Sequence, residues 1–307
     1  MQDVIKEIID EEILDIQCCS RLLHKNIVYH VSTINNEYAV KFFNGGTDKE
    51  ERFKKEILMY NFFQDKKVIN TSEIIDIRNS IYGNVITMKW INGKSIKSKL
   101  KNDSLNNCYS DIQNMLNDME KIWKIKDGEF RNKLPIDKLG IENRFNKSEK
   151  SILTQIIRNK PKIDFFEIIN IYTELKKLIK PNLNFVINSD ISTHEYLITN
   201  QKAYWLDFET YKLGNPNNDL ARAFQSLTNS IYNRKDEFER IYDLFKNNRY
   251  YNAQIFLYYL TEKLFSTIYT ANNQINEDEI NFYINFIKEN FYNINNNIKI
   301  KKRNYFK

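Results

Sequence analysis

Two pairs of segments near the start of the chain have runs of apolar residues of the types that favour β-strands. Residues 27–31 and 38–43 are rich in β-branched and aromatic side chains and flank two asparagines at 35–36, which predicts a β-hairpin. Residues 72–78 and 84–90 have the same character. This part of the chain is therefore expected to form an antiparallel sheet.

A helix is expected between the two strand pairs. Phe53, Ile57 and Tyr60 recur at helical intervals, so their side chains share one face. Thr47 and Glu50 precede this stripe at the spacing of a capping box, which predicts that the helix begins there. The predicted order is strand, strand, helix, strand, strand.

In the rest of the chain the apolar positions mostly follow a helical period. One stripe consists of Ile112, Met115, Leu116, Met119, Ile122 and Trp123. Residues 168–179 and 252–271 have similar patterns. Because the pattern changes near 90–94, and because the chain is long for a single core, we expect a sheet-bearing domain at 1–91 and a helical domain at 92–307.

One short stretch of strand pattern interrupts the helical part. Residues 184–187, 196–199 and 202–206 have strand character, and Asn200-Gln201 supply a two-residue turn between the last two segments. The sequence therefore predicts a second hairpin.

Acidic residues are expected to converge at the open end of this second hairpin. With the predicted turn, Glu195 lies opposite Leu206 and diagonally across from Asp207, and Asp190 precedes the same strand. Converging carboxylates repel each other, and Mg²⁺, which prefers oxygen ligands, relieves that repulsion. On spacing alone, a solvated acidic rim is an equally good interpretation.

The composition favours a folded protein, since 42% of the residues are hydrophobic and 20 Phe and 19 Tyr are present. The net charge of +6 is scattered, except for a basic tail formed by Lys299, Lys301, Lys302 and Arg303. We interpret this tail as a solvated end, and a nucleic-acid or membrane-surface binder is the least favoured alternative.

The first residues lack the pattern of a signal peptide, and no apolar run reaches the length of a membrane span. Three cysteines show neither a disulfide framework nor metal-ligand spacing. The sequence therefore predicts a cytoplasmic protein with no nucleic-acid and no membrane partner, either monomeric or homodimeric.

Three motifs in a fixed order around the second hairpin carry a resemblance to a known family. The chain has N-S-D-I-S-T-H-E at 188–195, L-D-F-E at 206–209 and G-N-P-N-N-D-L-A at 214–221. This segment resembles the catalytic segment of aminoglycoside phosphotransferases and choline kinases, in which H-G-D-x-x-x-x-N precedes D-F/W-E or D-F-G and then G-x-P-x-x-D-L-A. The resemblance implies an α+β, two-lobed protein kinase-like fold, with a small antiparallel-sheet N-lobe containing one helix and a larger, mainly helical C-lobe carrying the catalytic hairpin.

The resemblance also implies a reaction, the transfer of the γ-phosphoryl group of ATP or GTP to a hydroxyl of a small molecule. Asp190 matches the catalytic acid that orients the hydroxyl and accepts its proton. Asp207 matches the acid that holds Mg²⁺ against the phosphates, and Glu195 takes the place of the second metal ligand, an Asn in the family. Asp219 matches an acid that braces the catalytic loop.

Residues of the predicted sheet match the family's nucleotide site. Lys41 corresponds to the lysine that contacts the α- and β-phosphates, and Glu56 to its carboxylate partner. Asn26 matches an Asn at the end of the phosphate loop. The loop itself departs from the pattern, because residues 19–26 contain none of the glycines that let backbone amides approach phosphates closely.

Lys89, Trp90 and Ile91 are similar to the hinge of the family, where backbone groups meet the edge of the adenine. We therefore expect the nucleotide base beside these three residues, although Trp90 fits a core position equally well. Two further departures, Asn188-Ser189 in place of His-Gly and Glu195 in place of Asn, raise a rival hypothesis. In that hypothesis the chain is a nucleotide-binding pseudokinase with little or no turnover.

The acceptor is the least specified part of the prediction. Glu209 directly after Asp207-Phe208 is similar to choline kinases and favours an amino-alcohol, whereas an aminoglycoside, a sugar or a protein hydroxyl are alternatives. An aromatic cage for a quaternary amine is conceivable, although stripes of this spacing are more often core: Trp123, Tyr258, Tyr259 and Tyr269.

Overall fold

The computed structural model describes residues 1–20, 26–200, 202–270 and 276–305, with side chains of the last helix described as far as residue 296. It consists of two compact units. The sheet unit comprises Met1–Ile96 with His194–Tyr211, and the helical unit comprises Lys97–Thr193 with Lys212–Lys307. Most of the predicted phosphate loop, the turn residue Gln201 and the basic tail side chains lie outside the described residues.

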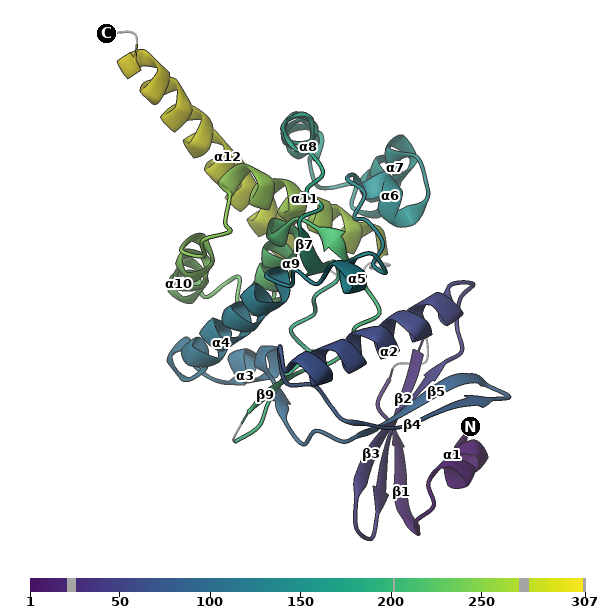
Figure 1. Cartoon of the computed structure of the whole chain (residues 1–307). Helices are drawn as coiled ribbons and strands as arrows, with labels where there is room; N and C mark the ends of the chain where they lie inside the picture. The colour runs from purple at the N-terminus through teal and green to yellow at the C-terminus, as the bar shows by residue number, and fades with distance from the viewer. Residues whose placement is uncertain (21–25, 201, 271–275, 306–307) are drawn as a thin grey trace. The chain divides into compact units, whose positions relative to one another are not determined.

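The sheet unit holds five antiparallel strands in the order β1-β2-β3-β5-β4 and a smaller sheet in the order β6-β8-β9 (Figure 1). Its elements are α1 (Gln2–Ile8), β1 (Ile13–Cys18), β2 (Asn26–Thr33), β3 (Glu37–Phe43), α2 (Lys49–Lys66), β4 (Ile74–Ser80), β5 (Gly83–Lys89), β6 (Lys94–Ser95), β8 (Tyr196–Ile198) and β9 (Ala203–Trp205). Both predicted hairpins and the order of strands and helix are confirmed.

The second hairpin has the predicted register, because Tyr196 pairs with Trp205 and Ile198 with Ala203. The Leu206 N–H donates to the Glu195 carbonyl at 2.9 Å, which continues the pairing to the open end. The boundary expected after Ile91 assigns this hairpin to the helical part. In the structure it belongs to the same compact unit as the five-stranded sheet.

Two features of the sheet unit differ from expectation. Helix α2 begins at Lys49 with Asp48 as its N-cap, so the predicted capping box at Thr47 is one residue too early. Asp48 instead pairs with Arg52 Nε at 3.3 Å. Helix α1 was not predicted, although its apolar side chains join β2, β3 and β5 in one buried cluster: Val4, Ile5, Ile8, Ile9, Val31, Val40, Phe42 and Val85.

The helical unit is built mainly around α11, which packs against α9, α12, α8 and α7. Its elements are α3 (Ile96–Asn102), α4 (Leu105–Trp123), α5 (Gly128–Arg131), α6 (Ile141–Phe145), α7 (Glu149–Asn159), α8 (Phe166–Leu178), β7 (Phe185–Asn188), β10 (Tyr211–Gly214), α9 (Pro216–Thr228), α10 (Lys235–Lys246), α11 (Ala253–Thr270) and α12 (Glu277–Tyr305). The predicted stripe on α4 is buried as expected. Among the described residues, no helix is both long and apolar enough to span a bilayer.

Helix α9 follows the G-N-P motif, and each motif residue has a local structural role. Asn215 is the N-cap and its side chain accepts from the Asn217 N–H at 3.0 Å, while Pro216 occupies the first turn. A Cβ at Gly214 would clash with the Ile187 side chain of the neighbouring strand β7, so glycine permits the close approach of β10. The motif therefore starts a helix whose polar residues are almost all buried.

Candidate active site

Lys41 is the centre of the charged cluster in the sheet unit. It lies on β3, and its Nζ is 2.6 Å from Glu56 Oε2 on α2 and 3.1 Å from Asp207 Oδ1 after β9. The Lys41 and Glu56 side chains are only 6% and 1% exposed. The structure thus brings together three residues that the sequence analysis selected separately.

The carboxylates of this cluster stabilise the positive charge of Lys41. Burial disfavours the charge on Lys41, but the carboxylates of Asp207, Glu56 and Glu209 outweigh it and raise the lysine's pKa above its ordinary value. Burial also raises the pKa of Glu56, although the charge of Lys41 opposes this change. The lysine is therefore held as a cation in a site that has more carboxylates than it can neutralise.

Asn26 belongs to a second layer of contacts around this cluster. Its Nδ2 donates to Glu209 Oε2 at 2.6 Å, and its Oδ1 accepts from Arg52 Nη1 at 2.6 Å. Arg52 Nη1 also lies 3.0 Å from Glu209 Oε2. Asn26 and Arg52 therefore both hold the Glu209 carboxylate in place. The predicted contact of Asn26 with phosphate stays a prediction.

Asp207 has an unusual backbone conformation, with a φ of 61° in the left-handed region. Such a φ is uncommon for a residue with a side chain, and such residues cluster at functional sites. The next residue, Phe208, is fully buried and packs edge-on against the rings of Tyr60 and Phe63 at 4.6 and 5.0 Å. The anchored phenyl ring and the left-handed backbone together direct the Asp207 carboxylate toward Lys41.

Among the described residues, one group of acids in the sheet unit is close enough to share a metal ion. Ligand oxygens of Glu56, Asp207 and Glu209 lie within 4.8 Å of one another, and Glu56 Oε1 is buried without a hydrogen-bond partner. Oxygen donors of this kind fit Mg²⁺. Glu195, the predicted second ligand, lies on the hairpin outside this group, and its role stays a prediction.

The backbone of the predicted hinge is engaged in the sheet. The Lys89 N–H donates to the Glu73 carbonyl at 2.9 Å, and the Trp90 N–H donates to the Glu37 carbonyl at 2.9 Å. Trp90 is half-buried and stacks on His30, with ring centroids 4.1 Å apart. These contacts fix the positions of Lys89 and Trp90, and the expected place of the base beside them and Ile91 stays a prediction.

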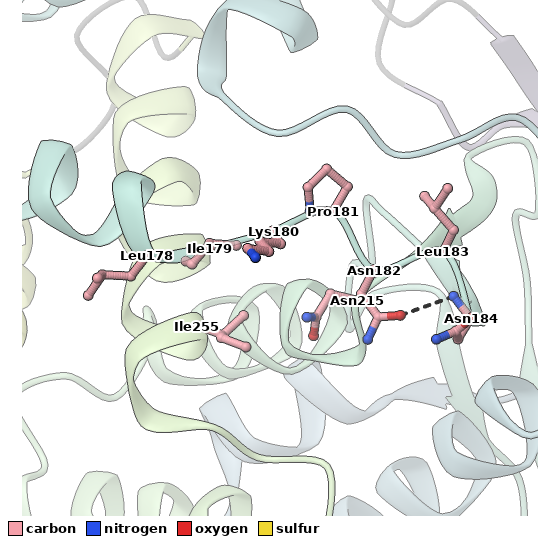
Figure 2. A pocket seen from close by; sticks show the side chains of 9 residues that line it. All are labelled: Leu178, Ile179, Lys180, Pro181, Asn182, Leu183, Asn184, Asn215 and Ile255. Carbon is pink, nitrogen blue, oxygen red and sulfur yellow. Dashed lines mark hydrogen bonds between the residues drawn. The ribbon is translucent and has the colours of Figure 1, made fainter.

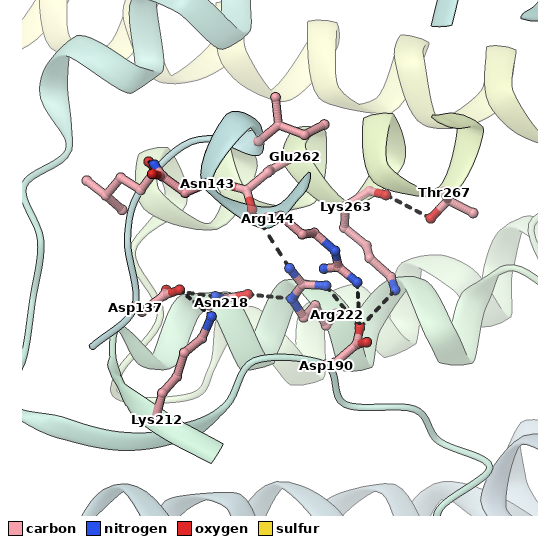
Figure 3. Close-up of polar contacts among 12 residues, drawn as sticks. Asp137, Asn143, Arg144, Asp190, Lys212, Asn218, Arg222, Glu262, Lys263 and Thr267 are labelled. Atoms are coloured by element: carbon pink, nitrogen blue, oxygen red, sulfur yellow. Dashed lines mark hydrogen bonds and ion pairs between the residues drawn. The ribbon is translucent and has the colours of Figure 1, made fainter. Parts of the chain in front are cut away.

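Asp190 is the centre of a second charged cluster, in the helical unit (Figure 3). It lies in the turn after β7, and its Oδ1 is 3.0 Å from Arg144 Nη2 on α6, 3.3 Å from Arg222 Nη1 on α9 and 3.6 Å from Lys263 Nζ on α11. Asp190 is only partly buried, and although this partial burial disfavours its charge, the three cations lower its pKa well below the ordinary value.

The turn that carries Asp190 is braced from below by Asp219 on α9. Asp219 Oδ2 accepts from Trp123 Nε1 at 2.9 Å and from the Asn188 N–H at 3.1 Å. Burial raises the pKa of Asp219 well above its ordinary value despite these bonds. Asp190 in turn donates its N–H to Asn188 Oδ1 at 3.3 Å. Asp219 thus has the bracing contacts expected of the family acid.

The aromatic residues considered for a cage are mostly core. Trp123, Tyr258 and Tyr259 are 1%, 0% and 3% exposed. A separate open pocket of about 610 Å³ lies near the start of α9 (Figure 2) and contains no predicted site residue. Its lining residues are Leu178, Ile179, Lys180, Pro181, Asn182, Leu183, Asn184, Asn215 and Ile255.

Several charged residues of the two clusters were not identified from the sequence. Arg52 precedes Glu56 by one helical turn, so an inward-facing Glu56 already placed Arg52 on the buried face. Arg222 follows Asp219 on the same buried helix, which was a comparable signal. Arg144 and Lys263 come from segments without a motif, and no pattern in the sequence indicated them.

The fold is the fold of a known group of enzymes. No family profile matches the sequence, and no curated protein matches it either. Among solved structures, spectinomycin phosphotransferase APH(9)-Ia with ADP and spectinomycin is 13% identical, with a TM-score of 0.60 over 95% of this chain and 97% of that chain.

Two further structures extend the comparison. A thermostable mutant of aminoglycoside phosphotransferase APH(4)-Ia, with AMP-PNP and hygromycin B, is 10% identical with a TM-score of 0.64 over 95% of this chain and 97% of that chain. Choline kinase LicA from Streptococcus pneumoniae is 15% identical with a TM-score of 0.55 over the same shares. The chain therefore has the kinase-like α+β fold of aminoglycoside phosphotransferases and choline kinase, which confirms the predicted resemblance and fold class.

Proposed function

We propose that the protein is an ATP- or GTP-dependent phosphotransferase that moves the γ-phosphoryl group to a hydroxyl of a small molecule. The observation that carries this proposal is the buried Lys41–Glu56 pair with Asp207 at 3.1 Å from the same Nζ. A buried lysine held by two acids on different elements is a costly arrangement for stability alone. It is the arrangement that phosphate binding in kinases requires.

In the sheet unit, Lys41 contacts the α- and β-phosphates and Glu56 holds the lysine in place. Asp207 is the metal ligand, with Glu195 as the second ligand proposed from the sequence. Mg²⁺, when bound, neutralises the charge of the phosphates. Lys89, Trp90 and Ile91 lie beside the base, and Asn26 at the end of the phosphate loop.

In the helical unit, Asp190 orients the acceptor hydroxyl. The acceptor oxygen forms a bond to the γ-phosphorus, the bond between that phosphorus and the bridging β-γ oxygen breaks, and the nucleoside diphosphate leaves with the electron pair. The hydroxyl proton passes to Asp190. The 42% exposure of the Asp190 side chain leaves it accessible to an acceptor.

The structural neighbours support both substrates of this reaction. They contain ADP with spectinomycin, AMP-PNP with hygromycin B and, in LicA, AMP. For the acceptor, an amino-alcohol, an aminoglycoside and a sugar remain the classes to be tested. Localisation in the cytoplasm and a monomeric or homodimeric state are part of the same proposal.

A pseudokinase is the second candidate, and one observation favours it. Oδ1 of Asp190 is in contact with three cations, which hold the acid that would otherwise receive the acceptor hydroxyl. In that case the chain binds nucleotide and releases no ADP with any acceptor.

Thermal unfolding with Mg·ATP and Mg·GTP tests nucleotide binding. We expect one of the two to raise the melting temperature, because a ligand that binds only the folded state stabilises it by mass action. Asp207→Asn is expected to remove most of the rise, and Asp190→Asn to preserve it. No rise with either nucleotide in the unmodified protein would contradict both candidates.

Turnover separates the enzyme from the pseudokinase. ADP or GDP release is measured against amino-alcohols, aminoglycosides, sugars and their acidic derivatives. Asp190→Asn is expected to abolish release that the unmodified protein shows, without changing the nucleotide-induced rise in melting temperature. Release by no acceptor, with the rise intact, would favour the pseudokinase.

A further inference from the structure

The charges around Asp190 indicate which class of acceptor binds to the helical unit. This inference rests on the proposed phosphotransferase function. We propose that the acceptor alcohol carries an anionic group, a carboxylate or a phosphate, which Arg144 and Lys263 bind beside Asp190. An acceptor of this class differs in charge from choline, which is a cation.

A single carboxylate oxygen of Asp190 contacts three cations. Arg144, Arg222 and Lys263 come from three different helices, and each approaches Oδ1 of Asp190 within 3.6 Å. Like charges at such separations repel, and one acid cannot offset three bases. The cluster is therefore short of negative charge on its exposed side.

The nearby acids do not balance the positive charge of these three cations. Asp137 is engaged by Lys212 at 2.6 Å and accepts from Asn218 Nδ2 at 3.0 Å. Two more buried acids lie nearby: Glu262 Oε1 is 3.8 Å from Arg222 Nη2, and Asp219 accepts from Trp123 and from the Asn188 N–H, with its pKa raised well above the ordinary value by burial. In the network of Figure 3, four cationic side chains face three carboxylates, and burial raises the pKa of one of these acids, Glu262.

Exposure to solvent distinguishes Arg222 from Arg144 and Lys263. Arg222 is 3% exposed and donates from Nε to Asn218 Oδ1 at 2.6 Å in addition to its acid contacts. Arg144 and Lys263 are 25% and 21% exposed. Arg222 is therefore a positioning residue, whereas Arg144 and Lys263 can turn to a ligand.

An anionic acceptor accounts for this arrangement. Its charged group pairs with the Arg144 guanidinium, whose planar fork matches a carboxylate or a phosphate, and with the Lys263 ammonium. These contacts draw the two cations away from Oδ1, so the carboxylate of Asp190 becomes available to the acceptor hydroxyl. The cations that hold Asp190 in the free protein thus become the specificity determinants of the bound one.

The test is equilibrium binding, measured by calorimetry in the presence of Mg·ADP. Matched pairs that differ in the charged group are compared: glycerate with glycerol, homoserine with its amide, and glucose 6-phosphate with glucose. Choline and spectinomycin are the cationic arms, and inorganic phosphate is the minimal probe. We expect an anionic member to bind at least about tenfold tighter than its uncharged counterpart. The carboxylate and phosphate arms show which of the two groups is recognised.

Variants locate the binding to this cluster. Arg144→Met is expected to raise the Kd of the anionic ligand about ten- to a hundredfold, because it removes a charge-assisted contact, and Arg144→Lys to retain part of the affinity. Arg249→Met is the matched control, since Arg249 is 55% exposed and pairs with Glu120 elsewhere in the helical unit. Asp207→Asn identifies any phosphate that binds at the nucleotide site instead.

Three outcomes would overturn the inference: tighter binding of choline or spectinomycin than of every anionic member, no binding of any anionic member, or anion binding that Arg144→Met leaves unchanged. Failure of the proposed function looks different, because the nucleotide-induced rise in melting temperature would then be missing. If that rise is intact and anions do not bind, only the acceptor inference fails.

Discussion

The two charged clusters of this protein are built in opposite ways. In the sheet unit one lysine, Lys41, is surrounded by the carboxylates of Glu56, Asp207 and Glu209. In the helical unit one acid, Asp190, is surrounded by two guanidinium groups and an ammonium group. The first cluster has acids to spare for a cation such as Mg²⁺, and the second has bases to spare for an anion. Because the sign of the uncompensated charge differs between the two clusters, we expect the first cluster to bind a cation and the second to bind an anion.

The largest expected effect on stability comes from replacing Lys41, the centre of the charged cluster in the sheet unit. Lys41→Met leaves Glu56 as a buried acid without its cation, so we expect the free energy of unfolding to fall by about 3–5 kcal/mol. Urea unfolding followed by circular dichroism measures the change. The double variant Lys41→Met/Glu56→Leu is expected to recover part of the loss. The single variant Glu56→Leu completes the cycle, and a loss in the double variant equal to the sum of the two single losses would show that the pair is not coupled.

Replacing Arg222 in the charged cluster of the helical unit is expected to cost less stability. Arg222→Met loses the bonds to Asn218 and Asp190 and the 3.8 Å contact with Glu262, but Arg144 and Lys263 still pair with Asp190, and one source of repulsion between cations disappears. We expect the free energy of unfolding to fall by about 1–3 kcal/mol in the same urea assay. A loss as large as that of Lys41→Met would mean that the two clusters do not differ in their surplus of charge.

The smallest expected effect is a dependence of acceptor affinity on pH. Burial, together with the charges of Arg222 and Arg144, lowers the pKa of Lys263 to about 8 against the opposing charge of Asp190. Lys263 is a cation below this pH and neutral above it, so affinity for an anionic ligand is expected to fall about two- to tenfold between pH 7 and 9. Calorimetric titrations across this range measure the fall.

Two variants assign this pH dependence. Lys263→Arg is expected to remove the fall because arginine keeps its charge throughout, and Lys263→Met to give weak binding at every pH. Burial raises the pKa of Glu262 on the same helix, so Glu262→Gln is needed to separate any contribution of that acid. A fall that persists in Lys263→Arg/Glu262→Gln would show that another group titrates.

The sequence predicted the sheet unit in considerable detail. Runs of β-branched and aromatic residues and a two-residue turn are local signals, and the register of the second hairpin, with Tyr196 opposite Trp205, followed from the turn alone. Lys41 and Glu56 came from the family resemblance, which the fold confirms. The error at the start of α2 is of one residue, because Asp48 and Thr47 are both good caps and the spacing to Glu50 favoured the wrong one.

The acceptor side could not be predicted in the same way. Arg144, Arg222 and Lys263 are separated by dozens of positions, and only tertiary packing of α6, α9 and α11 brings them to one oxygen. No periodicity or short motif encodes such a meeting of three helices. The basic residues were therefore interpreted as part of a scattered charge excess, and the sequence supplied the acid of the cluster without its partners.

The left-handed backbone at Asp207 has a consequence for how remote changes affect this protein. The carboxylate belongs to a residue with an uncommon φ of 61°, and the ring of the next residue, Phe208, packs against the rings of Tyr60 and Phe63. We expect that a slight loosening of this aromatic packing lets the backbone torsion of Asp207 relax and moves its carboxylate away from Lys41. The contact between Asp207 and Lys41 thereby depends on hydrophobic side chains that lie outside the charged cluster.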